Sequence, residues 1–213
     1  MTARRTLTTA GAIAVTAIVA ACSGTPAPSA NSAPTDSSGS TSPRVAATSQ
    51  PHAAATELNP SGDIPDNQAY VAFSPAGGGY SVKIPEGWSR TAAGTSTSFT
   101  DKLNRIEVSM VAAPAQPTIA SITSKDVPSV NSKVPKFTMG KVTSVLRGGG
   151  RAILLTYQGD STPDQVTGKV IRDAFERYTF YRAGKRVDLT LSGPTGADNV
   201  DPWRIVSDSL RWS

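Results

Sequence analysis

Strict alternation of apolar and polar residues is the feature that most constrains the fold of this chain. Ile106, Val108 and Met110 alternate with charged or hydroxyl-bearing residues, and residues 187–191 repeat the pattern. Residues 80–84 alternate in the same way. Because successive side chains of a β-strand point to opposite faces, each stretch predicts a half-buried strand. We therefore expect a sheet with one face packed on an apolar core.

Shorter signals predict the remaining strands. These strands lie at residues 70–73, 97–100, 137–146, 153–155 and 170–181. Gly140 marks a candidate β-bulge, and Ala183-Gly184 forms the tight turn of the last hairpin. The run Arg147-Gly148-Gly149-Gly150 resembles a phosphate-binding loop in composition. It predicts a hairpin turn instead, because no Gly-Lys-Ser/Thr follows it and the next element is a strand.

Helical spacing predicts two helices. In residues 118–130, Ile119, Ile122 and Val127 recur near the helical period, and Pro128 should end this helix.

The second predicted helix lies at the C-terminus. Asp201 is its expected N-cap and Pro202 its first residue. Trp203, Val206 and Leu210 then lie at positions i, i+3 and i+7, and should bury one face of the helix against the sheet.

Antiparallel hairpins combined with two helices favour an α+β fold. We expect a twisted antiparallel sheet flanked by helices. The three tryptophans, at positions 88, 203 and 212, are interpreted as core aromatics.

The N-terminal residues predict a lipoprotein signal peptide over residues 1–21. Arg4 and Arg5 precede an apolar run of about a dozen residues, too short to span a bilayer as a helix of about 20 residues. That run ends in Val19-Ala20-Ala21-Cys22, the pattern of a bacterial lipobox, with Cys22 as the acylated residue that carries palmitate-type chains. An ordinary secretory signal with a chance cysteine is the alternative. The run beginning Arg4-Arg5 also leaves twin-arginine export open.

Residues 22–57 predict a lipid-anchored, disordered stalk. Ser, Thr, Pro, Ala and Gly dominate it, and Val45 is its only larger aliphatic residue. Such a segment buries too little apolar surface to offset its chain entropy. His52, the only histidine, lies within it. Residues 58–213 then form a single α+β domain, and the expected location is the extracytoplasmic face of the cell membrane.

Composition excludes several classes of function. The net charge is +5, and +3 without Arg4 and Arg5, which is too small to indicate nucleic-acid binding. A single cysteine excludes a disulfide framework, and with a single stalk histidine it leaves no ligands for a zinc cage. A Ser-His-Asp triad needs a histidine on the folded scaffold. We therefore predict no catalytic residues, no metal and no cofactor, with a two-carboxylate hydrolase as the remaining enzymatic alternative.

Four stretches of the domain share a pattern with a known fold family. They are Pro85-Glu86-Gly87-Trp88 at a strand end, the strand at 106–110, the hairpin at 172–191 and the final segment at 203–212. Together with the cysteine motif and the stalk, they resemble actinobacterial lipoproteins with a Mog1/PsbP-like domain, over about residues 70–212. The resemblance implies an α/β/α sandwich used as a binding or assembly module. No functional residue is assigned from it.

The expected function is that of a binding or adaptor module for a cell-envelope complex, such as a transporter or a lipid or glycan export system. A carrier of a small lipid or glycan is the alternative, and a cavity of about 300 Å³ or more lined by aromatic residues would favour it. Arg182, Lys185 and Arg186 surround the last hairpin turn and form a candidate docking patch for anionic lipid or an acidic envelope protein. The alternative is a solvated hairpin end. The oligomeric state is left open.

Overall fold

The computed structural model describes residues 61–163 and 168–213. Three sequence predictions lie outside these residues: the signal peptide at 1–21, the acylated Cys22, and the stalk at 22–57 with His52. The same is true of residues 58–60, the first three of the predicted domain.

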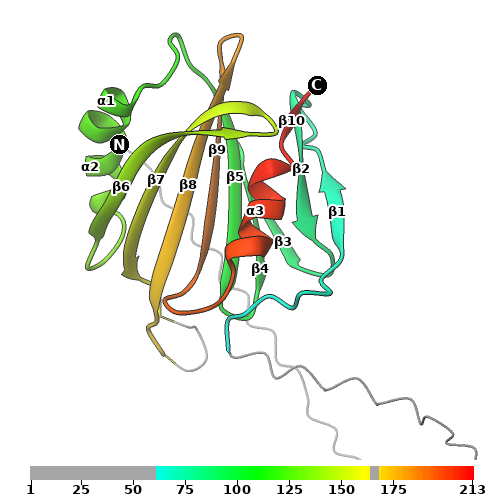
Figure 1. The fold of residues 1–213 in the computed structure, drawn as a ribbon, viewed down its shortest axis with the longest axis vertical. Helices are drawn as coiled ribbons and strands as arrows, with labels where there is room; N and C mark the ends of the chain where they lie inside the picture. The colour runs from blue at the N-terminus through cyan, green and yellow to red at the C-terminus, as the bar shows by residue number, and fades with distance from the viewer. Residues whose placement is uncertain (1–60, 164–167) are drawn as a thin grey trace, which may run out of the picture. The chain divides into compact units, whose positions relative to one another are not determined.

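A large antiparallel sheet of seven strands forms the body of the domain (Figure 1). In spatial order its strands are β3 (Ser89–Ala93), β4 (Ser96–Asp101), β5 (Asn104–Ala112), β9 (Lys185–Pro194), β8 (Arg172–Arg182), β7 (Gly150–Asp160) and β6 (Thr138–Arg147). Every predicted strand of this sheet is present. β3 was not predicted, because its five residues are all exposed and none is a large apolar residue.

A small sheet and a helix cover one face of the large sheet. The small sheet comprises β1 (Tyr70–Phe73), β2 (Tyr80–Pro85) and β10 (Arg211–Trp212), and the helix is α3 (Val200–Asp208). Val82 and Ile84 of β2 and Val206 of α3 share one core with Val108 and Leu189 of the large sheet. We call this side of the large sheet the α3 face.

A second helical segment covers the opposite face, which we call the α2 face. It runs through α1 (Ile119–Ser121), a π-helical turn η1 (Ile122–Asp126) and α2 (Val127–Asn131). Ile122 and Val130 pack there on Ile153 and Leu155 of β7. Leu154, between them, packs on the α3 face, so β7 is apolar on both faces as predicted. The domain is thus an α+β fold, a predominantly antiparallel sheet flanked by helices.

The prediction that Pro128 ends the first helix is wrong. The helix continues to Asn131, and Ser132 donates its N–H to the Pro128 carbonyl at 3.0 Å. The turn before Pro128 is π-helical, and the Val127 N–H bonds back to the Ile122 carbonyl. This wider turn takes up a proline, which has no N–H to continue a regular ladder.

The C-terminal helix begins earlier than predicted. Its first residue is Val200 and its N-cap residue is Asn199, rather than Asp201. The Asn199 side chain makes no capping bond, because it is used elsewhere. Its Oδ1 accepts the N–H of Ile64 at 2.8 Å, and its Nδ2 donates to the Gly62 carbonyl at 2.9 Å. The asparagine therefore fixes residues 62–64 against the start of α3.

Two glycine predictions are confirmed. The pairing of β6 with β7 shifts register between Met139 and Val142, so Gly140 lies in a bulge. A Cβ atom on Gly140 would lie 2.4 Å from Thr156 Oγ1 and 2.8 Å from its carbonyl oxygen. The run at 147–150 is a hairpin turn, as expected. A Cβ atom on Gly148 would lie 2.0 Å from the Asp208 carbonyl oxygen, which explains the glycine there.

Candidate functional site

A groove of about 370 Å³ opens on the α3 face, between α3 and one end of β6, β7 and β8. In Figure 1, α3 lies in front of the sheet next to β5, and β6, β7 and β8 lie to its left. The groove is lined by Thr138, Met139, Gly140, Thr156, Tyr157, Gln158, Ala174, Phe175, Glu176 and Trp203. We call it the Trp203 groove. Among the described residues of this lining, Glu176 is the only carboxylate.

Strand alternation decides which side chains supply the chemistry of the groove. On β7, Thr156 and Gln158 alternate with Tyr157, which packs with Leu155 on the α2 face. Tyr157 stacks there on Phe175, with ring centroids 4.5 Å apart and planes 5° from parallel. These two residues therefore border the groove through their backbone, and Trp203 supplies its aromatic ring.

Trp203 combines two environments. It packs against the core of the α3 face, in line with the sequence prediction, but remains partly exposed. Its helical neighbours Pro202 and Val206 are buried, which leaves Trp203 on the edge of the apolar stripe. The indole thus forms one wall of the groove. The sequence analysis missed this role, because the helical spacing of residues 203, 206 and 210 indicated core packing alone.

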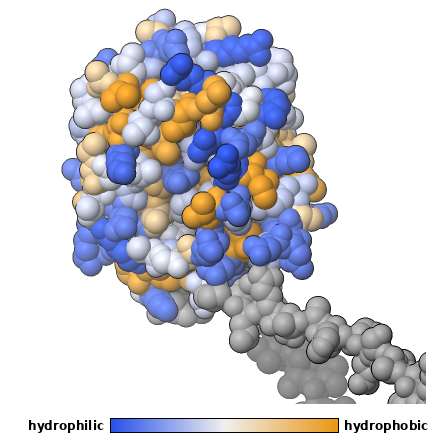
Figure 2. Space-filling model, viewed as in Figure 1, coloured by the Kyte–Doolittle hydropathy of each residue, from blue (hydrophilic) through white to orange (hydrophobic). Residues whose placement is uncertain are grey.

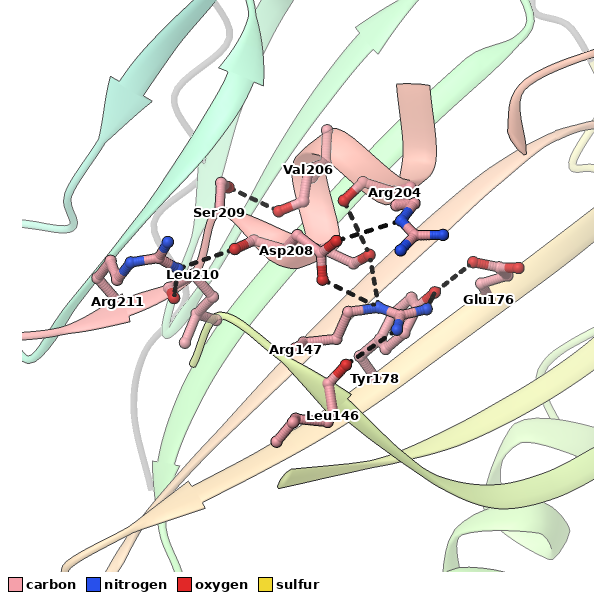
Figure 3. Close-up of polar contacts among 11 residues, drawn as sticks. Leu146, Arg147, Glu176, Tyr178, Arg204, Val206, Asp208, Ser209, Leu210 and Arg211 are labelled. Carbon is pink, nitrogen blue, oxygen red and sulfur yellow. Dashed lines mark hydrogen bonds and ion pairs between the residues drawn. The ribbon is translucent and has the colours of Figure 1, made fainter. Parts of the chain in front are cut away.

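Glu176 belongs to a chain of polar contacts that leaves the groove toward α3 (Figure 3). The Tyr178 hydroxyl donates to Glu176 Oε2 at 2.6 Å. Arg147 Nη2 in turn donates to the Tyr178 oxygen at 3.3 Å, and the guanidinium carbon lies 5.2 Å from the ring centroid. Burial is the main cause that raises the pKa of Tyr178, and the hydrogen bond to Glu176 raises this pKa further. Tyr178 therefore stays protonated at neutral pH and orients the Glu176 carboxylate.

Arg147 connects the hairpin of β6 and β7 to α3. Its Nε donates to Ser207 Oγ at 3.2 Å and lies 3.5 Å from Asp208 Oδ1. Beyond it, Trp212 Nε1 donates to the Gly149 carbonyl at 2.9 Å. These contacts fix α3, and with it Trp203, at a set position over the sheet.

The predicted docking patch is divided by the structure. Arg182 and Lys185 lie exposed beside the turn, as expected. The Arg186 side chain, 17% exposed, points to the α2 face instead, where its Nε donates to both Asp188 oxygens at 3.0 Å. Its Nη2 bonds Asp126 of η1. Successive side chains of β9 point to opposite faces of the sheet. Arg186 therefore points away from the face of the exposed Lys185 and lies on the same face as Asp188. Two cations therefore remain at the tip.

Two further observations bear on function. Within residues 61–163 and 168–213, no cluster of three or more His, Cys, Asp or Glu side chains is arranged to hold a metal. The helices of the same residues are all too short or too polar to cross a membrane. The predictions of no enzymatic activity and no cofactor remain predictions.

Known proteins resemble the chain in structure. No protein-family model and no curated protein matches it. PsbP of Synechocystis sp. PCC 6803 is 16% identical with a TM-score of 0.47, over 77% of this chain and 100% of that one. LpqN, involved in cell envelope biogenesis of Mycobacterium tuberculosis, is 12% identical with a TM-score of 0.41, over 70% and 92%.

The Ran-binding protein Mog1p of Saccharomyces cerevisiae is 9% identical with a TM-score of 0.40, over 66% of this chain and 87% of that one. This chain spans about half the length, 48%, of a further match, a protein of Bacteroides thetaiotaomicron. PsbP and Mog1p carry the two names of the fold family that the sequence resembles. The likenesses are to a fold, and at these identities they bring no ligand or partner to this chain.

Proposed function

We propose that the protein is a membrane-anchored, extracytoplasmic binding module that holds a small glycan-like ligand in the Trp203 groove. The observation that carries this proposal is the groove itself. Its volume of about 370 Å³ lies in the lower part of the range of about 300–1,000 Å³ typical of small-molecule sites. This volume exceeds the value of about 300 Å³ above which a cavity favours a carrier over an adaptor.

The side chains of the groove suit a sugar. An indole presents a flat apolar surface to the C–H face of a sugar ring, and Trp203 forms one wall. Glu176 uses one oxygen for Tyr178, and a carboxylate accepts further hydrogen bonds on its other lone pairs. Thr138, Thr156 and Gln158 add hydroxyl and amide groups. Ala174 leaves space for a ring because its side chain is small.

The cellular location in this proposal rests on the sequence. Acylation of Cys22 would anchor the mature chain, and two acyl chains hold a protein on a membrane far more firmly than one. A flexible stalk of the predicted length spans roughly 30 Å. The binding domain would thus reach ligands of the cell envelope near the outer surface of the membrane.

An adaptor for an envelope protein complex is the second candidate function. One observation favours it. A hollow of about 370 Å³ between β2 and α3 is bordered by the apolar residues Ala72, Val82 and Ile205, of which Ile205 is exposed, and by the polar residues Ser81, Lys83, Asp208, Ser209 and Arg211. Figure 2 shows several apolar patches among hydrophilic residues on the face seen in Figure 1. A hollow that combines an exposed apolar residue with polar and charged neighbours suits contact with a protein partner.

Nuclear magnetic resonance of the indole N–H groups tests the ligand proposal. The full-length chain in detergent has three tryptophans, so Trp88 and Trp212 serve as internal controls for Trp203. Neutral mono- and disaccharides, titrated to about 50 mM, should shift the Trp203 resonance alone.

Glu176→Gln keeps the shape of the side chain and should weaken this binding about tenfold, since it removes a charged acceptor. Glu86→Gln, an exposed carboxylate in the turn after β2, is the matched control and should bind as the unchanged protein does. A titration without any shift of the Trp203 signal would refute the sugar proposal. Recovery of a crosslinked envelope partner that is lost on Ile205→Asp would then favour the adaptor function.

A further inference from the structure

A second cavity lies on the α2 face, beneath the C-terminal end of α2. Its volume is about 200 Å³. It is lined by Arg105, Glu107, Val130, Lys133, Val134, Tyr157, Phe175, Arg177, Thr190 and Ser192. We call it the Arg177 pocket. The sheet separates it from the Trp203 groove, because Tyr157 and Phe175 turn their rings to this side.

The pocket gathers positive charge. Three cations, Arg105, Lys133 and Arg177, line it together with a single carboxylate, Glu107. Each oxygen of that carboxylate already accepts one bond. Arg105 Nη2 lies 2.7 Å from Oε2, and Ser96 Oγ donates to Oε1 at 3.0 Å.

Arg177 is the central cation, and its hydrogen bonds are incomplete. Its side chain is 26% exposed, and Nη2 lies 3.0 Å from Asp188 Oδ2. That carboxylate also receives Arg186 Nε at 3.0 Å and Thr179 Oγ1 at 2.7 Å, so it is saturated. Arg177 Nε is buried and has no hydrogen-bond partner within the described part of the chain. A buried, charged donor without an acceptor is rare in a native protein, and a bound water or ion is one explanation for it.

Further donors surround the same space. Thr190 and Ser192 alternate with the buried Leu189 and Leu191 of β9, so their hydroxyls lie on the α2 face. Burial raises the pKa of Tyr157 to about 12, against the smaller opposing effect of the Arg177 charge. The phenol is therefore a protonated donor at neutral pH. Donors thus outnumber acceptors among the side chains that line the pocket.

We propose that the Arg177 pocket binds an oxyanion, the phosphoryl or carboxylate head group of a small ligand. A guanidinium fork matches the geometry of such a group and forms the strongest class of hydrogen bond. Phe175, Val130 and Val134 provide an apolar border for the part of the ligand next to the anion. The volume is below the range for entire drug-sized ligands, so the pocket accommodates a head group rather than a large molecule. Its position on the opposite face makes it independent of the Trp203 groove.

Calorimetric titration of the full-length chain in detergent tests this site. The probes are inorganic phosphate, glycerol 3-phosphate and acetate, each measured at low salt and at about 0.15 M salt. Binding of glycerol 3-phosphate stronger than that of phosphate identifies an ester head group. Equal binding of the two identifies free phosphate, and preference for acetate identifies a carboxylate. Binding should weaken with salt in each case.

Three variants locate the anion. Arg177→Gln should weaken binding at least tenfold, and Lys133→Gln about threefold, since Lys133 is exposed and contributes charge alone. Lys141→Gln is the matched control on β6, outside the pocket lining, and should change binding less than twofold. Lys133→Gln decides the question if Arg177→Gln does not fold. The proposal is wrong if none of the probes binds at about 10 mM, or if both pocket variants bind like the control.

Discussion

Replacing Asp173 with Asn should stabilise the protein at neutral pH. Asp173 on β8 is 7% exposed, and its Oδ1 has no hydrogen-bond partner among the described residues. Burial, and secondly the charge of Asp160, raises the pKa of Asp173 from 3.8 to about 6. The folded protein at pH 7 therefore holds a carboxylate where a neutral group would be favoured.

The magnitude follows from the shift. One pKa unit corresponds to about 1.4 kcal/mol, so ionisation of Asp173 costs on the order of 3 kcal/mol of folding free energy at pH 7. Between pH 4 and pH 6 the folded state binds more protons at this group than the unfolded state. The free energy of unfolding therefore falls as pH rises through this window. Below pH 4 the group is neutral in both states, and the cost is absent.

Urea unfolding of the full-length chain and of Asp173→Asn checks this reasoning. The variant should be more stable by about 2–3 kcal/mol at pH 7.5, and by less than about 1 kcal/mol at pH 4. The pKa of Asp160 is lowered, mainly by its hydrogen bond to Lys136. Protonation of Asp160 below pH 4 destabilises both proteins equally, so its effect cancels in the difference between their free energies of unfolding. A gain that is the same at both pH values, or a loss at pH 7.5, would refute the assignment of a buried charge to Asp173.

Four further changes have defined outcomes. Trp203→Ala should cost about 2 kcal/mol in urea unfolding, half the value for a buried ring, and should abolish sugar-induced shifts. Arg186→Gln leaves Asp126 without its ion pair and Asp188 with Arg177 alone, and should cost about 3 kcal/mol by the same assay. Gly140→Ala forces a Cβ atom against Thr156 and should lower stability by about 1–3 kcal/mol, measured as thermal midpoint. Cys22→Ser should abolish labelling with radioactive palmitate, and retained label would disprove the acylation.

The sheet was predictable because it follows a local rule. Alternation at 106–110 and 187–191 marks β5 and β9 in the sequence, and both strands pair in register across the centre of the sheet. β3 carries no such signal, since its residues are small or polar and exposed. The π-helical turn before Pro128 could not be predicted from the sequence either. Asp126, its last residue, bonds Arg186, a residue 60 positions away in the sequence.

The candidate site could be predicted from the sequence only in part, and for a different reason. Glu176 falls in phase with Tyr178 and Phe180, whose rings are buried on the α3 face. A charged residue in phase with buried aromatics indicates a polar group facing the core side of a sheet. That signal was present in the sequence and was overlooked. Trp203 gave no such signal, because helical spacing does not tell a core residue from one at the edge of the buried stripe.

The two faces of the sheet differ in what holds their helices, and this difference links binding to stability. α3 is held by buried apolar residues such as Val206 and by the contacts of Arg147 with Ser207 and Asp208. The segment α1–η1–α2 is built of pieces of three to five residues, too short to be stable helices alone, and buries few large side chains. Its attachment relies on the ion pairs of Arg186, which share Asp188 with Arg177. An anion bound by both Arg177 and Lys133 would tie the residues that follow α2 to the sheet and hold the segment more firmly. Phosphate binding in the Arg177 pocket should therefore slow hydrogen exchange in residues 119–131 and leave α3 unchanged.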